Sequence, residues 1–185
     1  MANGRFSGNP KTEWLARPPS DRDMKLLEDF WYDDPKGRHW LAPMGSIING
    51  ASIPQALWST VGSPYTDNYR RASIVHDVAC DDPTINRDDA DEMFYYACRA
   101  GGCSFLQAKI LYAGVRIGAW AGYTGLISLA PGAPSLLLRL PSEHTKDELE
   151  LRAKFTLISR SLESTADDFN EIRRVVDEQL KPHTK

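Results

Sequence analysis

Residues 70–100 read RRASIVHDVACDDPTINRDDADEMFYYACRA, and the fold can be predicted outward from them. Small and apolar residues recur at steps of three and four in both halves, as is typical of helices that bury one face. We expect helices at about 66–80 and 86–100, with Asn86 as the N-cap of the second and a pair of glycines at its end. Because the turn between them is short, the two helices should pack antiparallel.

A histidine lies on the buried face of the first predicted helix. His76 falls on that face, whereas Asp77 points about 100° away from it. The other residues of the face are Ala72, Val75 and Ala79. In the second helix Asp91 borders the apolar stripe, and Asp88 lies about one turn earlier. An antiparallel pair therefore brings the imidazole close to Asp91 or, alternatively, to Asp88.

A histidine held by a carboxylate is a candidate general base. One ring nitrogen is held by the acid, and the other accepts a proton from water near neutral pH. Asp77 can ligate a hard cation such as Ca²⁺ together with backbone carbonyls of a glycine-containing loop. This arrangement predicts metal-assisted hydrolysis, and it requires the ring to lie in a hollow that solvent enters.

The same residues allow two other interpretations. A histidine on an apolar face is often a hydrogen-bonded core residue, and Asp88 can simply complement the helix dipole. Transition-metal binding is the second alternative, because positions four apart share a helix face. Its candidate ligands are His76, Cys80, Asp88 and Asp91.

Composition restricts the class of protein. The chain has 185 residues, long enough for a substantial core, and a net charge of −3, which provides no basic field for nucleic acid. Its three cysteines form no CxxC pair, so we expect reduced thiols in a cytosolic protein. The first residues, MANGRFSGNPK, contain no apolar run, so we expect no signal peptide and synthesis in the cytoplasm.

The rest of the chain predicts an α+β fold. Aromatic and β-branched runs within 24–48, separated by a DPKG turn, predict a small antiparallel sheet. A capping-box sequence predicts a third helix at about 104–121. We divide the chain into a disordered or extended arm (1–22), an α+β core domain (23–140) and a C-terminal helical extension (141–185).

Residues 117–138 contain no charged residue. Such a stretch is long enough to span a bilayer, but Pro131 and Pro134 interrupt it. Glycines at every fourth position, Gly114, Gly118 and Gly122, favour a close-packed helix followed by a loop. A surface that contacts membrane lipid is the alternative.

The C-terminal extension predicts an amphipathic helix over about 144–181. Its apolar seam consists of Phe155, Ile158, Leu162, Thr165, Phe169, Ile172 and Val176. A break is possible in SLESTADD, where Ser164 or Thr165 can start a second helix. The seam either packs on its own domain or binds a partner, which includes a second copy of the chain.

Several motifs in residues 24–120 resemble a known family. The run WLAPMGSIINGASIPQALWSTVGSPYTDNYRRASIVHDVACD, followed by DDADEMFYYACRAGG and AKILYAGVRIG, resembles the family called domain of unknown function 1353. The resemblance implies a phage or prophage setting, often near tail or host-interaction genes, and no established activity. In that setting the partner of the C-terminal seam is expected to be a phage protein. In the loop that reads NGASIP here, residues 49–54, the family usually has Asp at the first position, where this chain has Asn49.

A second, local resemblance concerns the two helices. The arrangement His76-Asp77…Asp91-Glu-Met-Phe94 is similar to the catalytic helices of secreted calcium-dependent phospholipases of bacteria and fungi. It implies His76 as general base, Asp77 as calcium ligand and Asp91 as the residue that orients the histidine. The same resemblance implies that Cys80 and Cys98 can pair under oxidising conditions.

The prediction is therefore a phage- or prophage-associated, metal-assisted hydrolase, most plausibly of lipid esters. Its expected cofactor is Ca²⁺ and its expected partner is membrane lipid, either from within a virion or after delivery to a membrane. The alternative is a non-enzymatic virion or tail-assembly protein. The residues expected to line the pocket are Asn49, Gly50, Ser52, Trp58 and Tyr95. Ser52 is interpreted as a turn hydroxyl rather than a nucleophile.

Overall fold

The computed structural model is α+β, as predicted. It describes residues 3–16, 23–50, 52–57, 61, 68–124 and 145–181. The chain forms two compact units, which we call unit 1 (Met1–Ala51 with Ser63–Ser104) and unit 2 (Ser52–Gly62 with Phe105–Lys185). This division differs from the predicted boundaries, because the third helix groups with the C-terminal helices.

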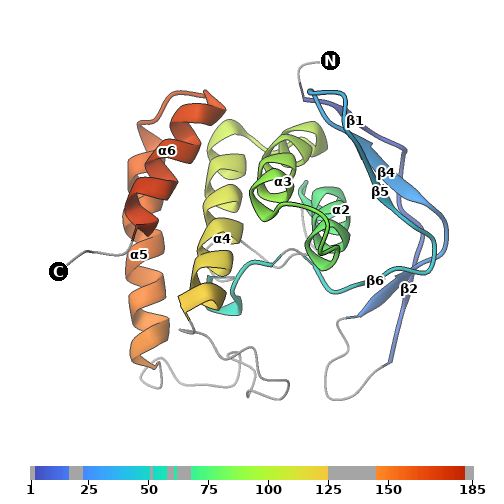
Figure 1. Cartoon of the computed structure of the whole chain (residues 1–185), viewed down its shortest axis with the longest axis horizontal. Coiled ribbons are helices and arrows are strands. Elements are labelled where there is room, and N and C mark those ends of the chain that lie inside the picture. The colour runs from blue at the N-terminus through green and yellow to red at the C-terminus, as the bar shows by residue number, and fades with distance from the viewer. Residues whose placement is uncertain are drawn as a thin grey trace. The chain divides into compact units, whose positions relative to one another are not determined.

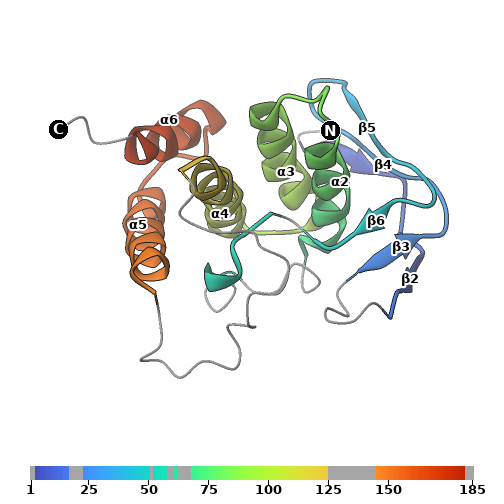
Figure 2. The same ribbon diagram turned by 60° about the horizontal axis from the view of Figure 1, so that its bottom comes forward.

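Unit 1 begins with two three-stranded antiparallel sheets (Figures 1 and 2). One has the order β1 (Arg5–Phe6), β4 (Phe30–Asp33), β5 (His39–Ala42), and the other β2 (Thr12–Trp14), β3 (Met24–Leu26), β6 (Ile47–Ile48). The predicted turn joins β4 to β5. Asp34 accepts hydrogen bonds there from the backbone N–H groups of Lys36 and Arg38. Gly37 supplies a positive φ of 84°.

Residues 1–22 were predicted to be a disordered or extended arm. The arm is extended, but its described part is paired rather than disordered: Arg5 pairs with Asp33, and Thr12 pairs with Leu26. The ring of Phe6 stacks on that of Phe30, with centroids 5.7 Å apart. These partners lie far along the chain, so local composition carries no signal of the pairing.

The two helices of the quoted stretch are α2 (Arg70–Asp81) and α3 (Arg87–Gly101), and they pack against each other (Figure 1). Their predicted apolar faces are buried. The amide of Asn68, before α2, donates to the carbonyl of Gly102, after α3, which confirms the antiparallel arrangement. A Cβ on Gly101 would lie 2.1 Å from the carbonyl oxygen of Asn68, so only glycine permits this approach.

The described part of unit 2 includes a short 3₁₀ helix, η1 (Gln55–Leu57), and the longer helices α4 (Phe105–Thr124), α5 (Lys146–Glu163) and α6 (Phe169–Leu180). The predicted close packing of the α4 glycines is confirmed at Gly114 and Gly118, which lie against residues 52 and 53. A Cβ on Gly118 would lie 2.2 Å from the carbonyl oxygen of Ser52, and Gly114 faces the side chain of Ile53. Residues 117–124 end α4, whereas 125–138 lie outside the described residues. In the described part of the chain, none of the helices combines the length and apolar character needed to cross a membrane.

The C-terminal extension is two helices rather than one. Asp168 caps α6 by accepting a hydrogen bond from the N–H of Glu171, so the break falls in the SLESTADD segment where it was considered possible. Lys109 of α4 pairs with Asp167 at 2.6 Å and donates to the carbonyl of Thr165 in this break. The buried seam residues are Phe155, Ile158, Leu162, Phe169, Ile172 and Val176.

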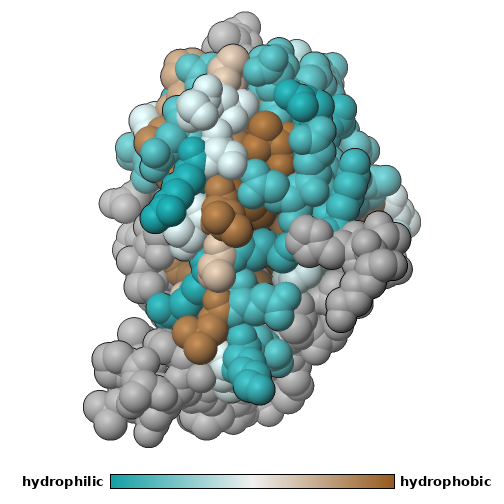
Figure 3. All heavy atoms as spheres, turned by 90° about the vertical axis from the view of Figure 1, so that its left-hand side faces the viewer, coloured by the Kyte–Doolittle hydropathy of each residue, from teal (hydrophilic) through white to brown (hydrophobic). Residues whose placement is uncertain are grey.

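The seam is thus buried within unit 2. On the face of this unit seen in Figure 3, hydrophobic side chains form a narrow band between hydrophilic ones. On α5, Leu149 and Leu157 are exposed. Self-association through the C-terminal helices stays a prediction, but the seam residues are not available for it.

Candidate functional site

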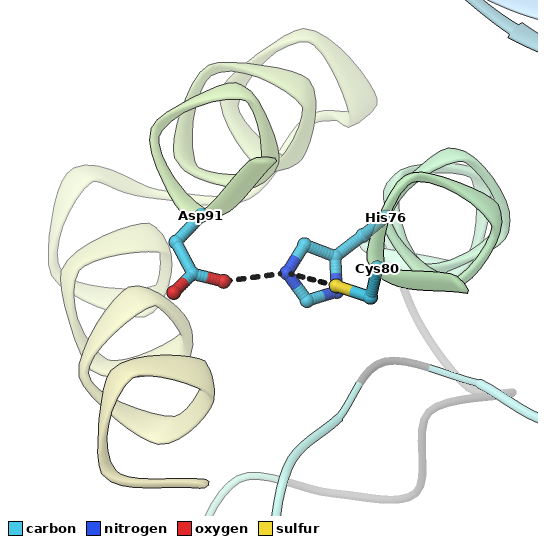
Figure 4. Close-up of side chains that lie close together, drawn as sticks. All are labelled: His76, Cys80 and Asp91. Carbon is cyan, nitrogen blue, oxygen red and sulfur yellow. Dashed lines mark hydrogen bonds and ion pairs between the residues drawn. The ribbon is translucent and has the colours of Figure 1, made fainter. Parts of the chain in front are cut away.

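A buried histidine–carboxylate pair joins α2 to α3. The Nε2 atom of His76 lies 2.7 Å from Oδ1 of Asp91, and both side chains are fully buried. Figure 4 shows the carboxylate pointing at the edge of the ring from the neighbouring helix. The predicted proximity is confirmed, and the partner is Asp91. The alternative, Asp88, is exposed in the first turn of α3, where its N–H bonds to the side chain of Asn86.

An arginine completes this network. The Nε atom of Arg87 donates to the same Oδ1 atom of Asp91 at 2.9 Å, across one turn of α3. Sequence reasoning missed this residue, although its four-residue spacing from Asp91 was a usable signal. Two donors therefore hold one carboxylate oxygen.

The surroundings determine the protonation states. Burial lowers the pKa of His76, against the opposing effect of Asp91, so the ring is neutral near pH 7. Burial acts to raise the pKa of Asp91, but the hydrogen bond from His76 and the charge of Arg87 outweigh it and the pKa is lowered. We therefore assign the imidazole proton to Nε2, which donates to the carboxylate, and a basic lone pair to Nδ1.

The ring is covered by two neighbouring side chains. Its centroid lies 4.7 Å from that of Phe94. The Sγ atom of Cys80 lies 3.5 Å from Nε2 and 3.7 Å from Nδ1 (Figure 4). Because the ring is fully buried, the prediction that it lies in a solvent-filled hollow is wrong for this structure. Cys80 is partly exposed and is the member of the cluster that meets solvent.

Asp77 lies on another side of α2 and holds the loop after β6. Its Oδ2 atom accepts hydrogen bonds from the backbone N–H groups of Asn49, at 2.6 Å, and Gly50, at 3.2 Å. Burial raises the pKa of Asp77 to about 7, although these two hydrogen bonds oppose the change, and the nearby carboxylates of Asp81 and Asp23 add to it. Asn49 and Gly50, which were expected to line the pocket, thus contact Asp77 through their backbone.

The polarity of that contact matters for calcium. A Ca²⁺ site needs oxygen ligands, whereas the loop presents N–H groups to Oδ2. The contact is that of a buried anchor for the loop. Calcium at Asp77 stays a prediction.

The other expected pocket residues lie elsewhere. Ser52 belongs to unit 2, where its carbonyl faces Gly118. Trp58 lies outside the described residues. Tyr95 is buried in α3, with its ring 5.2 Å from that of Tyr96. None of these positions gives evidence for the role predicted.

A small hollow lies between α2 and β5. Its volume is about 80 Å³, and its lining includes Trp40, Leu41, Val75 and Ala79. Ligand pockets usually measure about 300–1,000 Å³. This hollow is therefore too small to hold a lipid.

None of the three cysteines forms a disulfide. Cys80 lies against His76, whereas Cys98 is fully buried and hydrogen-bonds to Cys103. The pairing of Cys80 with Cys98 that was considered for oxidising conditions is not formed. One group of three potential metal ligands exists among the described residues, namely His76, Cys80 and Asp91.

Comparison with known proteins agrees with the sequence motifs. Residues 24–115 match the family described as protein of unknown function (DUF1353). This part of the chain is a DUF1353 domain. The matched residues contain strands β3, β4, β5 and β6, helices α2 and α3, and the first half of α4.

Two curated relatives come from Sinorhizobium fredii (strain NBRC 101917 / NGR234). The uncharacterized protein y4jT is 38% identical over 109 residues, which cover 59% of this chain and 32% of the relative. The uncharacterized protein y4iH is 38% identical over 99 residues, which cover 53% of this chain and 41% of the relative. The chain thus aligns with well under half the length of either relative. No solved structure matches.

Proposed function

We propose that the DUF1353 domain hydrolyses esters, with His76 as the general base and Asp91 as the residue that orients it. The observation that carries this proposal is the 2.7 Å contact between Nε2 and Oδ1, which holds one nitrogen and leaves the other as base. Arg87 keeps the carboxylate ionised and in place. A neutral, oriented imidazole is the form in which histidine accepts a proton from water.

The proposed reaction uses Nδ1. This atom takes a proton from a water molecule as the water oxygen bonds to the ester carbonyl carbon. The tetrahedral adduct then expels the alkoxide by breaking the carbon–oxygen bond, and the imidazolium returns the proton to the alkoxide. Because the ring is fully buried in this structure, the reaction requires Cys80, the partly exposed side chain next to Nδ1, to move aside and admit water and substrate.

The substrate class and the setting rest on resemblance. Lipid esters are proposed because the spacing of His76, Asp77 and Asp91 is similar to that in secreted phospholipases. A cation at Asp77 that polarises the ester carbonyl would complete that similarity, and its loop donors in this structure do not favour it. The phage or prophage setting is likewise part of the proposal.

A non-enzymatic role is the second candidate. It is favoured by the complete burial of His76 and by the hydrogen bonds that satisfy both Asp77 and Asp91. In that case the His76–Asp91 pair only fastens α2 to α3. The protein would then be a component of a virion or of tail assembly.

One assay separates the two candidates. Short-chain soluble esters and phosphatidylcholine vesicles are incubated with the purified chain, with Ca²⁺ or with a chelator. His39→Ala is a matched control, because His39 contacts Asp33 at 2.7 Å but is exposed. The enzymatic proposal predicts a rate about 10²–10⁴-fold lower in His76→Ala and unchanged in His39→Ala. Absence of hydrolysis by the wild type, or equal rates in His76→Ala and wild type, supports the non-enzymatic candidate.

A further inference from the structure

The cluster around His76 contains a third potential ligand that the proposed reaction does not use. One atom each of His76, Cys80 and Asp91, a nitrogen, a sulfur and an oxygen, lie within 4.8 Å of one another. Cys80 follows His76 by one helical turn, so both side chains project from the same face of α2 (Figure 4). We propose that these three residues bind a thiophilic divalent cation of the Zn²⁺ type.

The spacing of the ligand atoms is close to that of such a site, but Sγ of Cys80 is nearly equidistant from both ring nitrogens, so this side chain must turn toward the Nε2 lone pair to bind the same ion. In a tetrahedral site with Zn–S of about 2.3 Å and Zn–N of about 2.0 Å, sulfur and nitrogen lie about 3.5 Å apart. The Sγ atom of Cys80 and Nε2 of His76 are 3.5 Å apart. Nitrogen and oxygen ligands lie about 3.3 Å apart in the same geometry, whereas Nε2 and Oδ1 of Asp91 are 2.7 Å apart. The carboxylate must therefore withdraw by about 0.6 Å, a small movement for a side chain.

The charges also suit a divalent ion. A thiolate and a carboxylate neutralise two positive charges, and a neutral imidazole adds none, so the complete buried site is uncharged. On binding, the thiol releases one proton to solvent, and the imidazole proton moves from Nε2 to Nδ1. The partly exposed Cys80 provides the route of entry and the position of a fourth, water ligand. Arg87 opposes binding, because its guanidinium competes for Asp91.

Metal binding would change the function of the same residues. The ion would occupy Nε2 and Asp91 would become a ligand, so the carboxylate would no longer orient the general base. A Zn²⁺-type ion would thus inhibit the hydrolysis proposed above. This consequence rests on the proposed function, whereas metal binding itself does not.

Cobalt titration tests the site without any activity assay. Chelator-treated, reduced protein is titrated with Co²⁺, and the thiolate-to-cobalt charge-transfer absorption is recorded, followed by displacement with Zn²⁺. Cys80→Ser removes the sulfur ligand conservatively at a partly exposed position. Cys98→Ala and His39→Ala are controls for a buried thiol outside the cluster and for an exposed histidine. Arg87→Gln removes the competing cation, and thermal denaturation verifies that each variant is folded.

The proposal predicts one equivalent of Co²⁺ per chain with a thiolate band. The band should be lost in Cys80→Ser, with Zn²⁺ affinity at least about 10-fold lower, and kept in both controls. Arg87→Gln should bind more tightly than wild type. The site is refuted if the wild type shows no thiolate band, or if the band survives in Cys80→Ser. Zn²⁺ binding without measurable ester hydrolysis would support the metal site and refute only the proposed function.

Discussion

Replacing Asp77 by Asn removes a buried charge and keeps an oxygen that can accept both loop hydrogen bonds. Asp77 is only 7% exposed, and burial raises its pKa from the ordinary 3.8 to about 7. The folded protein therefore holds the proton on Asp77 more tightly than the unfolded chain does. The contribution of Asp77 to stability is therefore greatest below about pH 4 and is lost as the pH rises from about 4 to about 7.

The size of the effect follows from the two pKa values. The difference between 3.8 and about 7 corresponds to about 4 kcal/mol of unfolding free energy. Below pH 4, Asp77→Asn should resemble the wild type, because the amide is close in shape to the protonated carboxyl. At pH 8 the variant should be the more stable protein by up to about 4 kcal/mol.

Urea denaturation followed by tryptophan fluorescence, at several pH values from 4 to 8, measures this difference. The contributions of other titrating groups cancel between variant and wild type. Asp88→Asn, which removes one exposed carboxylate from α3, is the matched control for the change in net charge. A difference between Asp77→Asn and wild type that stays constant with pH would refute the reasoning. Repeating the series with Ca²⁺ tests the calcium prediction, because an ion at Asp77 lowers its pKa and abolishes the pH dependence.

Three further changes test the packing of the units. Gly101→Ala should lower the unfolding free energy, measured in urea, by about 1–3 kcal/mol, because the alanine Cβ would clash with the Asn68 carbonyl. If the variant is as stable as the wild type, the backbone shifts to make room for the Cβ. Ile172→Ala should cost about 2–5 kcal/mol and leave the mass in light scattering unchanged, since this seam residue is buried within unit 2; a change in mass would indicate a partner seam instead. Lys109→Ala should lower the unfolding free energy by about 1–3 kcal/mol, measured by thermal denaturation, because Asp167 loses its ion-pair partner and the Thr165 carbonyl loses its hydrogen-bond donor. An unchanged stability would show that solvent replaces the lysine.

The helical part of the fold and the central contact of the site were predictable because their signals are local. Apolar periodicity defined the buried faces of α2 and α3, and a short turn then required the two helices to be antiparallel. From these two facts the contact between His76 and Asp91 follows. The four-residue spacing of Arg87 and Asp91 carried equally local information, which was overlooked.

The features that were missed depend on distant parts of the chain or on side-chain packing. Strands β1 and β2 are short and polar, and they are ordered by pairing with β4 and β3. The burial of the His76 ring depends on how Phe94 and Cys80 pack over it, which periodicity does not specify. Likewise, the sequence predicted that Asn49 and Gly50 line a pocket, but it did not indicate that their backbone N–H groups bond to Asp77.

The most direct test of the central claim is the kcat for ester cleavage by Asp91→Asn. Asn keeps the size of the side chain and an acceptor for Nε2–H, but it removes the charge that orients the ring and stabilises the imidazolium. The account predicts a kcat at least about 100-fold below that of the wild type, with little change in KM and a folded protein. A kcat within about twofold of the wild type would contradict it.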